Sequence, residues 1–421
     1  MTRAPAPRRR RARRILTVGV ALALAGAGCR ADDRGAPASQ PPAPSSTATT
    51  AGSTAPAPSA VPGADPADGP EVLPAGRPGD LLAVTDRRSA DVPPGSRAWD
   101  VRYRSTGVGG AAVAVSGVVL APTTPVPAGG RPVVSWAHGT TGVADVCAPS
   151  RSGLRIPYLE ALLAAGYVVA ATDFEGLGTA GTHPYLVGAS EGRSVLDAAR
   201  AASNLAEAGA GREVVVLGHS QGGHAALFAG ELAEDYAPDL QLAGVVAGAP
   251  VGELSQLMGT AAGIGFGAGF LALVVAAYAA TYPDADPAAV LTPTGVSLLG
   301  RVEEVCLGGV AGAFLARPLA DLVRASPLDD PAWARRLREN EPGAAPVAAP
   351  VLVVQGDDDI LVPASTTDTT VARLCRVGTD VEYRRYEGAD HVGVLGPAET
   401  GVLTFVADRL AGAPAPAGCP A

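Results

Sequence analysis

Short runs of apolar, largely β-branched residues recur along the chain and are separated by longer stretches of helical pattern. The runs lack polar alternation, which is typical of strands buried on both faces of a sheet. Between them, apolar residues recur at three- and four-residue spacing, as in helices. This alternation predicts an α/β fold, a mainly parallel sheet with helices on both faces. The predicted strands are Pro132–Trp136, Tyr167–Thr172, Val214–Leu217, Leu242–Val246 and Val351–Gln355, and the predicted helices are Tyr158–Ala165, Glu191–Ala208 and Gln221–Asp235.

The alternation stops between Val251 and Pro346, where roughly a hundred residues of helical and loop character intervene before the next strand. We expect a helical cap or lid, residues 252–346, inserted into one domain, residues 80–421. The stretch Leu254–Tyr282 carries no charge and is long enough to cross a bilayer. Its cluster of glycines and its place inside the alternation favour cap helices, and an apolar cap suits a lid that faces lipid.

The N-terminal segment has the composition of an export signal. Seven arginines lie in the first fourteen residues, and an uncharged apolar run, Ile15–Gly28, follows them. That run is too short to span a membrane, so residues 1–29 are predicted to be a signal peptide. Cys29 ends it as at a lipoprotein processing site, which predicts a secreted protein or one anchored by a lipidated Cys29 to the outer face of the cell membrane.

Residues 30–79 are dominated by Ala, Pro, Ser, Thr and Gly, with too few large apolar residues to build a core. We expect a disordered tether there. The chain has 421 residues and a net charge of −9, so nucleic acid is not an expected partner. In an oxidising compartment its even set of four cysteines beyond the signal predicts two disulfides, and spacing alone leaves three pairings open. Those cysteines are Cys147, Cys306, Cys375 and Cys419.

The first candidate catalytic motif is Gly218-His219-Ser220-Gln221-Gly222. It directly follows the predicted strand Val214–Leu217, and a helical pattern begins immediately after it. This is the strand, sharp turn and helix of a nucleophile elbow, the arrangement of α/β-hydrolases. The turn brings strand and helix too close for side chains two residues before and after the serine, and Gly218 and Gly222 meet that need. Ser220 is therefore the predicted nucleophile of an ester hydrolase.

A second stretch, Gly188-Ala189-Ser190-Glu191-Gly192, matches the Gly-x-Ser-x-Gly pattern equally well. Nothing resembling a buried strand leads into Ser190, whereas a helical pattern follows it. Ser190 is better explained as a helix N-cap, whose hydroxyl accepts a backbone N–H bond.

A serine hydroxyl needs an imidazole to take its proton, and the imidazole needs a carboxylate to orient it. In this fold the order along the chain is serine, acid, histidine. Only His224 and His391 follow Ser220. His224 lies one turn into the elbow helix and is expected to pack there, so His391, in the loop after the strand-like Val381–Arg385, is the predicted base.

The acid is expected at the end of the strand Val351–Gln355, where Asp357, Asp358 and Asp359 compete. Related hydrolases place it three residues after the glycine and four before the proline that here are Gly356 and Pro363. This spacing selects Asp359 and leaves the other two as solvated turn residues.

The transition state carries an oxyanion that needs two N–H donors. One comes from the residue after the nucleophile, here Gln221, and the other from a loop after an earlier strand. Ala137-His138-Gly139-Thr140-Thr141 is such a loop, which places Thr140, in preference to Thr141, at the oxyanion hole. His138 is then a positioning residue.

Together these residues resemble the secretory lipase family, α/β-hydrolases typified by fungal lipase A-type enzymes. The resemblance spans roughly residues 95 to 410. It implies hydrolysis of carboxylic esters, often triacylglycerols, with a lipid or small ester as substrate, a helical cap, and no metal or other cofactor. It also implies disulfides that join Cys147 to Cys306 and Cys375 to Cys419. A short-chain carboxylesterase of the same fold is the alternative. The four matching stretches are Ala137–Gly142 with Cys147–Ser150, Asp173–Gly178, the Ser220 elbow, and the Asp359 and His391 loops.

Two other functions compete on weaker grounds. Gly176-Leu177-Gly178-Thr179-Ala180-Gly181 matches the dinucleotide fingerprint of a nicotinamide-dependent oxidoreductase, but Thr182-His183-Pro184 follows where the pyrophosphate-binding helix should begin. The second alternative is a hydrolase fold that has become a non-catalytic surface binding module. Such a module would not need Ser220, Asp359 and His391 together. The aspartates 357–359 could hold calcium only weakly.

Overall fold

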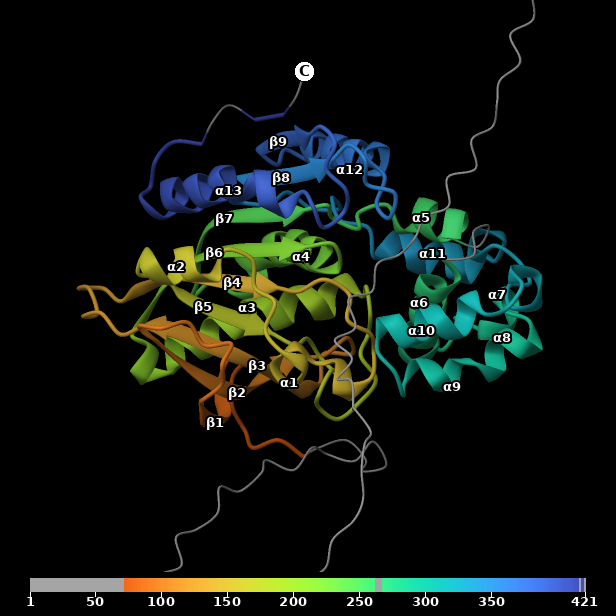
Figure 1. Ribbon diagram of the computed structural model, residues 1–421, viewed down its shortest axis with the longest axis horizontal. Helices are drawn as coiled ribbons and strands as arrows, with labels where there is room; N and C mark the ends of the chain where they lie inside the picture. Colours follow the sequence, from red (N-terminus) through yellow and green to blue (C-terminus); the bar gives the residue numbers. More distant parts are fainter. Residues whose placement is uncertain (1–71, 262–266, 416–417, 420–421) are drawn as a thin grey trace, which may run out of the picture. The chain divides into compact units, whose positions relative to one another are not determined.

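The structure, a computed structural model, describes residues 72–261, 267–415 and 418–419, all within one folded unit, Val61–Ala421 (Figure 1). The predicted signal peptide, Cys29 and nearly all of the predicted tether lie outside the described residues.

In the described part of the chain, nine strands form one sheet in the order β1-β2-β3-β5-β4-β6-β7-β8-β9. The strands from β5 to β9 in this order are parallel to one another, and β1–β3 are antiparallel. The parallel strands other than the edge strand β9 are buried over most of their length, as the uninterrupted apolar runs predict, whereas β9 is mostly half-buried. Their bounds are β4 Arg131–Ala137, β5 Val168–Thr172, β6 Ala210–His219, β7 Gln241–Gly248, β8 Val351–Gly356 and β9 Val381–Tyr386.

The apolar runs do not predict the antiparallel strands, β1 Leu81–Arg87, β2 Ser96–Thr106 and β3 Ala112–Pro122. The strand β2 alternates, since Trp99, Val101 and Tyr103 are buried while the residues between them are half-buried. This period of two is the signal of a strand with one face on the core.

Helices cover both faces of the sheet, which confirms the predicted fold class. Alternate side chains of each strand enter different cores: Val133 packs with α3 and α4, and Val134 packs with α2 and α13. The bounds are α2 Leu159–Ala164, α3 Gly188–Asn204, α4 Gln221–Tyr236, α12 Ala364–Arg376 and α13 Leu395–Leu410.

Between β7 and β8 the chain forms the cap, a set of helices gathered beyond the carboxyl ends of the parallel strands (Figure 1). Its apolar core includes Leu271, Val274 and Tyr278 of α6 and continues to residues outside the cap, such as Leu186 and Val362. Its helices are α5 Leu254–Ala261, α6 Gly267–Thr281, α7 Pro287–Val290, α8 Pro293–Ser297, α9 Leu299–Val302, α10 Leu307–Leu315 and α11 Pro331–Glu339.

The uncharged stretch Leu254–Tyr282 contains the two cap helices α5 and α6. A helix that is apolar on every side must be buried on every side, and α6 is surrounded by other cap helices. Within the described residues, none of the helices has the length and apolar character required to cross a bilayer.

Candidate active site

Ser220 lies between the end of β6 and the first turn of α4, with φ 60° and ψ −117°. The backbone reaches this left-handed region because strand and helix meet without side chains between them. A Cβ on Gly218 would lie 1.9 Å from the carbonyl oxygen of Gly222, and one on Gly222 would lie 1.9 Å from that of Ala137. The two glycines are therefore required by the elbow.

The structure brings Ser220, His391 and Asp359 together from three different loops. His391 Nε2 is 2.9 Å from Ser220 Oγ, and His391 Nδ1 is 2.7 Å from Asp359 Oδ2. Because a carboxylate only accepts, Nδ1 carries the proton and Nε2 is left to accept the serine proton. This is the hydrogen-bonded chain of nucleophile, base and acid that acyl transfer needs.

Asp359 is buried and anchored by its own loop. Its Oδ1 accepts the backbone N–H groups of Leu361 at 2.9 Å and Val362 at 2.8 Å, and Gln355 Nε2 donates to Oδ2 at 3.1 Å. Burial alone would raise the pKa of Asp359, but the hydrogen bond and charge of His391 and these other donors outweigh it, so the pKa is lowered. The carboxylate is held ionised beside the imidazole.

The neighbouring aspartates are placed differently. Asp357 and Asp358 are exposed, and Asp357 Oδ1 accepts from Arg385 at 2.6 Å. Among the described residues, no group of three or more His, Cys, Asp or Glu side chains is arranged to hold a metal ion.

His219, whose role the sequence did not indicate, supports His391, the predicted base. Its Nε2 donates to the backbone carbonyl of His391 at 2.7 Å, and the two rings lie 4.8 Å apart. Burial, with a smaller effect of the nearby His391, lowers the pKa of His219 to about 4, so the ring is neutral near pH 7. The elbow thus fixes the loop that carries His391.

Thr140 and Gln221 both lie near Ser220: Gln221 follows it in the chain, and Thr140 lines the same two cavities. Gln221 is the first residue of α4, so its N–H is among those with no partner inside the helix. Thr140 follows β4, and a Cβ on the preceding Gly139 would lie 3.6 Å from Ser220 Cβ. His138 is buried and bridges this turn to the next loop, with Nδ1 2.7 Å from Gly139 O and Nε2 3.3 Å from Asp173 O.

The structure corrects the prediction for Ser190. It lies inside the first turn of α3, whose N-cap is Val187, and its hydroxyl donates to Glu175. Other side chains satisfy the entry to this helix: Asn340 Oδ1 accepts the N–H of Gly188 at 2.9 Å, and Glu191 Oε1 accepts that of Leu186 at 2.9 Å. A serine cap is therefore not needed.

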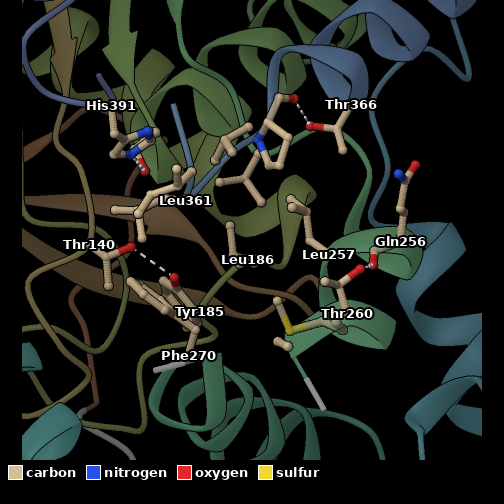
Figure 2. Close-up of a pocket in the computed structure, with 18 residues that line it drawn as sticks. Thr140, Tyr185, Leu186, Gln256, Leu257, Thr260, Phe270, Leu361, Thr366 and His391 are labelled. Atoms are coloured by element: carbon tan, nitrogen blue, oxygen red, sulfur yellow. Dashed lines mark hydrogen bonds between the residues drawn. The ribbon is translucent and has the colours of Figure 1, made fainter. Parts of the chain in front are cut away.

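Two cavities meet at Ser220. One has a volume of about 110 Å³ and runs between α5 and the loop after Asp359. Figure 2 shows Leu186, Leu257 and Leu361 around it, with His391 toward one side and Thr260 toward the other. The second, about 640 Å³, extends from the loop that follows β4 to the residues around Arg155. Thr140, Ser220, Phe270, Leu361 and His391 line both.

The Cys147–Cys306 disulfide joins the loop after the Thr140 turn to the start of α10 in the cap. The N–H of Leu307 also donates to the carbonyl of Thr141 at 2.8 Å. Cys375 is bonded to Cys419. Both disulfides that the resemblance implied are confirmed.

The sequence profile named "Secretory lipase" matches residues 151–418, more than half of the chain. The chain belongs to the secretory lipase family. As a member of that family it is a carboxylic ester hydrolase with the α/β-hydrolase fold. The competing dinucleotide-binding interpretation of Gly176–Gly181 fails, because this stretch lies in a loop and α3 begins only at Gly188.

Relatives of this secretory lipase are named both as triacylglycerol lipases and as a probable inactive lipase. It is 29% identical to a Mycobacterium tuberculosis protein named "Probable inactive lipase", over 83% of each chain. It is 27% identical to a secreted triacylglycerol lipase of Malassezia globosa, over 80% of this chain and 76% of that one. Relatives named as secreted support an extracellular location.

Solved structures share the fold. Candida antarctica lipase A in its closed state superposes with a TM-score of 0.71 at 21% identity, over 81% of this chain and 84% of that chain. The rice cell wall degrading esterase LipA from Xanthomonas oryzae superposes with a TM-score of 0.65 at 20% identity, over 79% and 98%. These likenesses concern the fold alone.

Proposed function

We propose that the protein is an extracellular lipase that cleaves triacylglycerols or other carboxylic esters through an acyl-enzyme on Ser220. The observation that carries the proposal is the unbroken chain from Ser220 Oγ through His391 to Asp359 Oδ2, with distances of 2.9 and 2.7 Å, at the point where two cavities meet. One relative is named a probable inactive lipase, so likeness to lipases alone is weaker support than this geometry.

In the first half-reaction, Ser220 Oγ attacks the ester carbonyl carbon while His391 Nε2 takes the serine proton. The buried carboxylate of Asp359 stabilises the imidazolium that forms. The backbone N–H groups of Thr140 and Gln221 donate to the oxyanion, where charge develops in the transition state. The carbon–oxygen bond of the ester then breaks, and the departing alcohol takes the proton from His391.

The second half-reaction reverses these roles with water. His391 removes a proton from a water molecule, whose oxygen attacks the acyl carbon on Ser220. The same donors stabilise the second oxyanion. The bond to Ser220 Oγ breaks, the serine recovers its proton from His391, and the carboxylic acid leaves.

The two cavities suggest how an ester would lie. The narrow one is lined by aliphatic side chains such as Leu186, Leu257 and Met258, which suits the hydrocarbon part of an acyl group. The wider one contains polar groups, among them Arg155 and Asp173, and has room for the alcohol part. The hydrocarbon chain of a bound acyl group would be buried against the cap side chains of the narrow cavity, which favours a lipid substrate.

A short-chain carboxylesterase is the second candidate, and one observation favours it. The apolar cavity of about 110 Å³ is smaller than the several hundred Å³ usual for sites that enclose larger ligands. A long acyl chain would need α5 to move away from Leu361.

Attachment through a lipidated Cys29 stays a prediction from the sequence, and loss of membrane association in Cys29→Ser would be its test.

The substrate class is tested with p-nitrophenyl esters from acetate to palmitate and a triacylglycerol emulsion, with Ser220→Ala as the blank. We expect the wild type to hydrolyse long-chain esters and the emulsion, and the variant to hydrolyse neither. Hydrolysis confined to short soluble esters would replace lipase by carboxylesterase. Absence of any ester hydrolysis by the folded wild type would overturn the proposal.

A further inference from the structure

The second Gly-x-Ser-x-Gly stretch places a buried carboxylate behind the proposed oxyanion hole. Glycines at 188 and 192 let α3 approach α4 closely: a Cβ on Gly188 would lie 2.2 Å from the ring of Phe228, and one on Gly192 2.8 Å from the backbone nitrogen of Ala229. This close contact sets Glu191 against the first turn of α4. Glu191 is fully buried.

Glu191 holds the side chain of Gln221, the residue whose N–H would donate to the oxyanion. Gln221 Nε2 donates to Glu191 Oε1 at 2.7 Å and to His183 Nε2 at 3.0 Å. His183 can accept there because its Nδ1 faces the carbonyl oxygen of Glu175 at 2.8 Å and so carries the proton. The amide of Gln221 is thus held from two sides.

The same carboxylate holds the segment that contacts Thr140. Glu191 Oε1 accepts the N–H of Leu186, which has a left-handed backbone, φ 57°. The preceding residue, Tyr185, has its hydroxyl 2.8 Å from Thr140 Oγ1, a contact visible in Figure 2. One buried group therefore reaches both sides of the oxyanion hole.

The negative charge of Glu191 has a partner within the same cluster. Its Oε2 lies 2.9 Å from His224 Nδ1, while His224 Nε2 lies 2.8 Å from the carbonyl oxygen of Asn340. Both ring nitrogens of His224 therefore lie against oxygen atoms, one of Glu191 and one of Asn340, which fixes the ring beside the carboxylate. A buried, paired carboxylate of this kind is a rigid anchor.

We propose that Glu191 is a positioning residue that fixes both halves of the oxyanion hole, through Gln221 on one side and through Leu186 and Tyr185 on the other. The inference rests on the proposed role of Ser220. Oxyanion donors act at about 2.7–3.1 Å from the developing charge, and a displacement of about 0.5 Å already weakens them, so a group that fixes them acts on the transition state more than on the bound ester.

The test compares Glu191→Leu with Asp197→Leu, a fully buried carboxylate on the same helix α3 that bonds to Ser105 and Arg200, away from Ser220. The readouts are kcat and KM for p-nitrophenyl butyrate and the inhibition constant of an alkyl trifluoromethyl ketone, which adds to the serine as a charged tetrahedral species. For Glu191→Leu we expect kcat to fall about 10- to 100-fold and the ketone to bind more weakly by a similar factor, with KM within about threefold.

Asp197→Leu should lose stability but keep kcat and ketone affinity within about threefold of the wild type. Glu191→Gln should restore both readouts. Its amide oxygen can accept from Leu186 and Gln221, and its amide nitrogen can donate to His224. Equal losses of kcat in the two leucine variants, or a loss in Glu191→Leu without weaker ketone binding, would overturn the inference.

If Glu191→Leu does not fold, the Gln221→Leu variant tests the inference instead. It removes the side-chain amide that donates to Glu191 and leaves the hydrogen bond between Glu191 and the N–H of Leu186 in place. We expect kcat and ketone affinity to fall together about tenfold, and values within threefold of the wild type would overturn the inference. If the wild type hydrolyses no ester, the proposed function itself has failed. If it does and Ser220→Ala does not, any failure concerns Glu191 alone.

Discussion

Cys147, just after the turn that carries Thr140, is covalently joined to Cys306, the residue before cap helix α10. The cap is therefore tied to one wall of the site, independently of its two chain connections to the sheet. The other disulfide, Cys375 to Cys419, ties α12 to the C-terminal segment and lies away from both cavities.

We expect replacement of Cys147 and Cys306 by Ser to lower the free energy of unfolding by about 2–5 kcal/mol and also to lower kcat/KM. The matched replacement of Cys375 and Cys419 should lower the unfolding free energy alone. Chemical denaturation and ester hydrolysis measure the two effects. Unchanged kcat/KM in the variant that lacks Cys147 and Cys306 would show that this disulfide does not support the site.

Asp359→Asn should lower kcat about 10³- to 10⁴-fold, because the amide cannot hold the imidazole in the right tautomer or stabilise the imidazolium. Asp358→Asn, one residue earlier and exposed, should leave kcat unchanged within about twofold. Steady-state kinetics on both variants tests the assignment. A comparable loss in both would contradict it.

Gly222→Ala should disrupt the elbow, because the added Cβ would meet the carbonyl oxygen of Ala137 at 1.9 Å. We expect a loss of at least about 3 kcal/mol in unfolding free energy, or failure to accumulate as folded protein. Gly312→Ala in cap helix α10 is the control, since its Cβ would meet nothing within 4 Å. That variant should be as stable as the wild type or more so.

Burial depresses the pKa of His219 to about 4, so the unfolded chain binds a proton there below about pH 6.5 that the folded protein does not bind. This histidine therefore costs stability increasingly as the pH falls from about 6.5 toward 4. Relative to His219→Asn, the wild type should lose about 1.4 kcal/mol per pH unit in that window. Urea unfolding of both proteins at pH 7 and pH 5 checks the sign, and a difference that stays constant between them would contradict it.

The central strands could be predicted because they are buried on both faces and so consist of uninterrupted apolar residues. The strand β2 mixes Trp99 and Tyr103 with charged residues between them, and only its period of two indicates a strand. The elbow was predictable for a steric reason, since Gly218 and Gly222 are both needed where strand and helix meet.

The surroundings of the proposed oxyanion hole could not be predicted. Glu191, Gln221 and Asn340 are far apart in the sequence. The packing of α3 on α4 brings the first two together, and the end of cap helix α11 places Asn340 against both helices. The same packing explains why Ser190 is not a cap, because Asn340 and Glu191 already satisfy the N–H groups at the entry to α3. Local patterns identify the residues that carry chemistry, while tertiary contacts decide which residues hold them in place.

The most direct test of the account is the rate of p-nitrophenyl butyrate hydrolysis by Ser220→Ala and by Ser190→Ala, the two serines with the same flanking pattern. We predict a loss of at least about a thousandfold for Ser220→Ala and less than about tenfold for Ser190→Ala, whose hydroxyl only donates to Glu175. Near-wild-type hydrolysis by folded Ser220→Ala would contradict the assignment of Ser220 as the nucleophile.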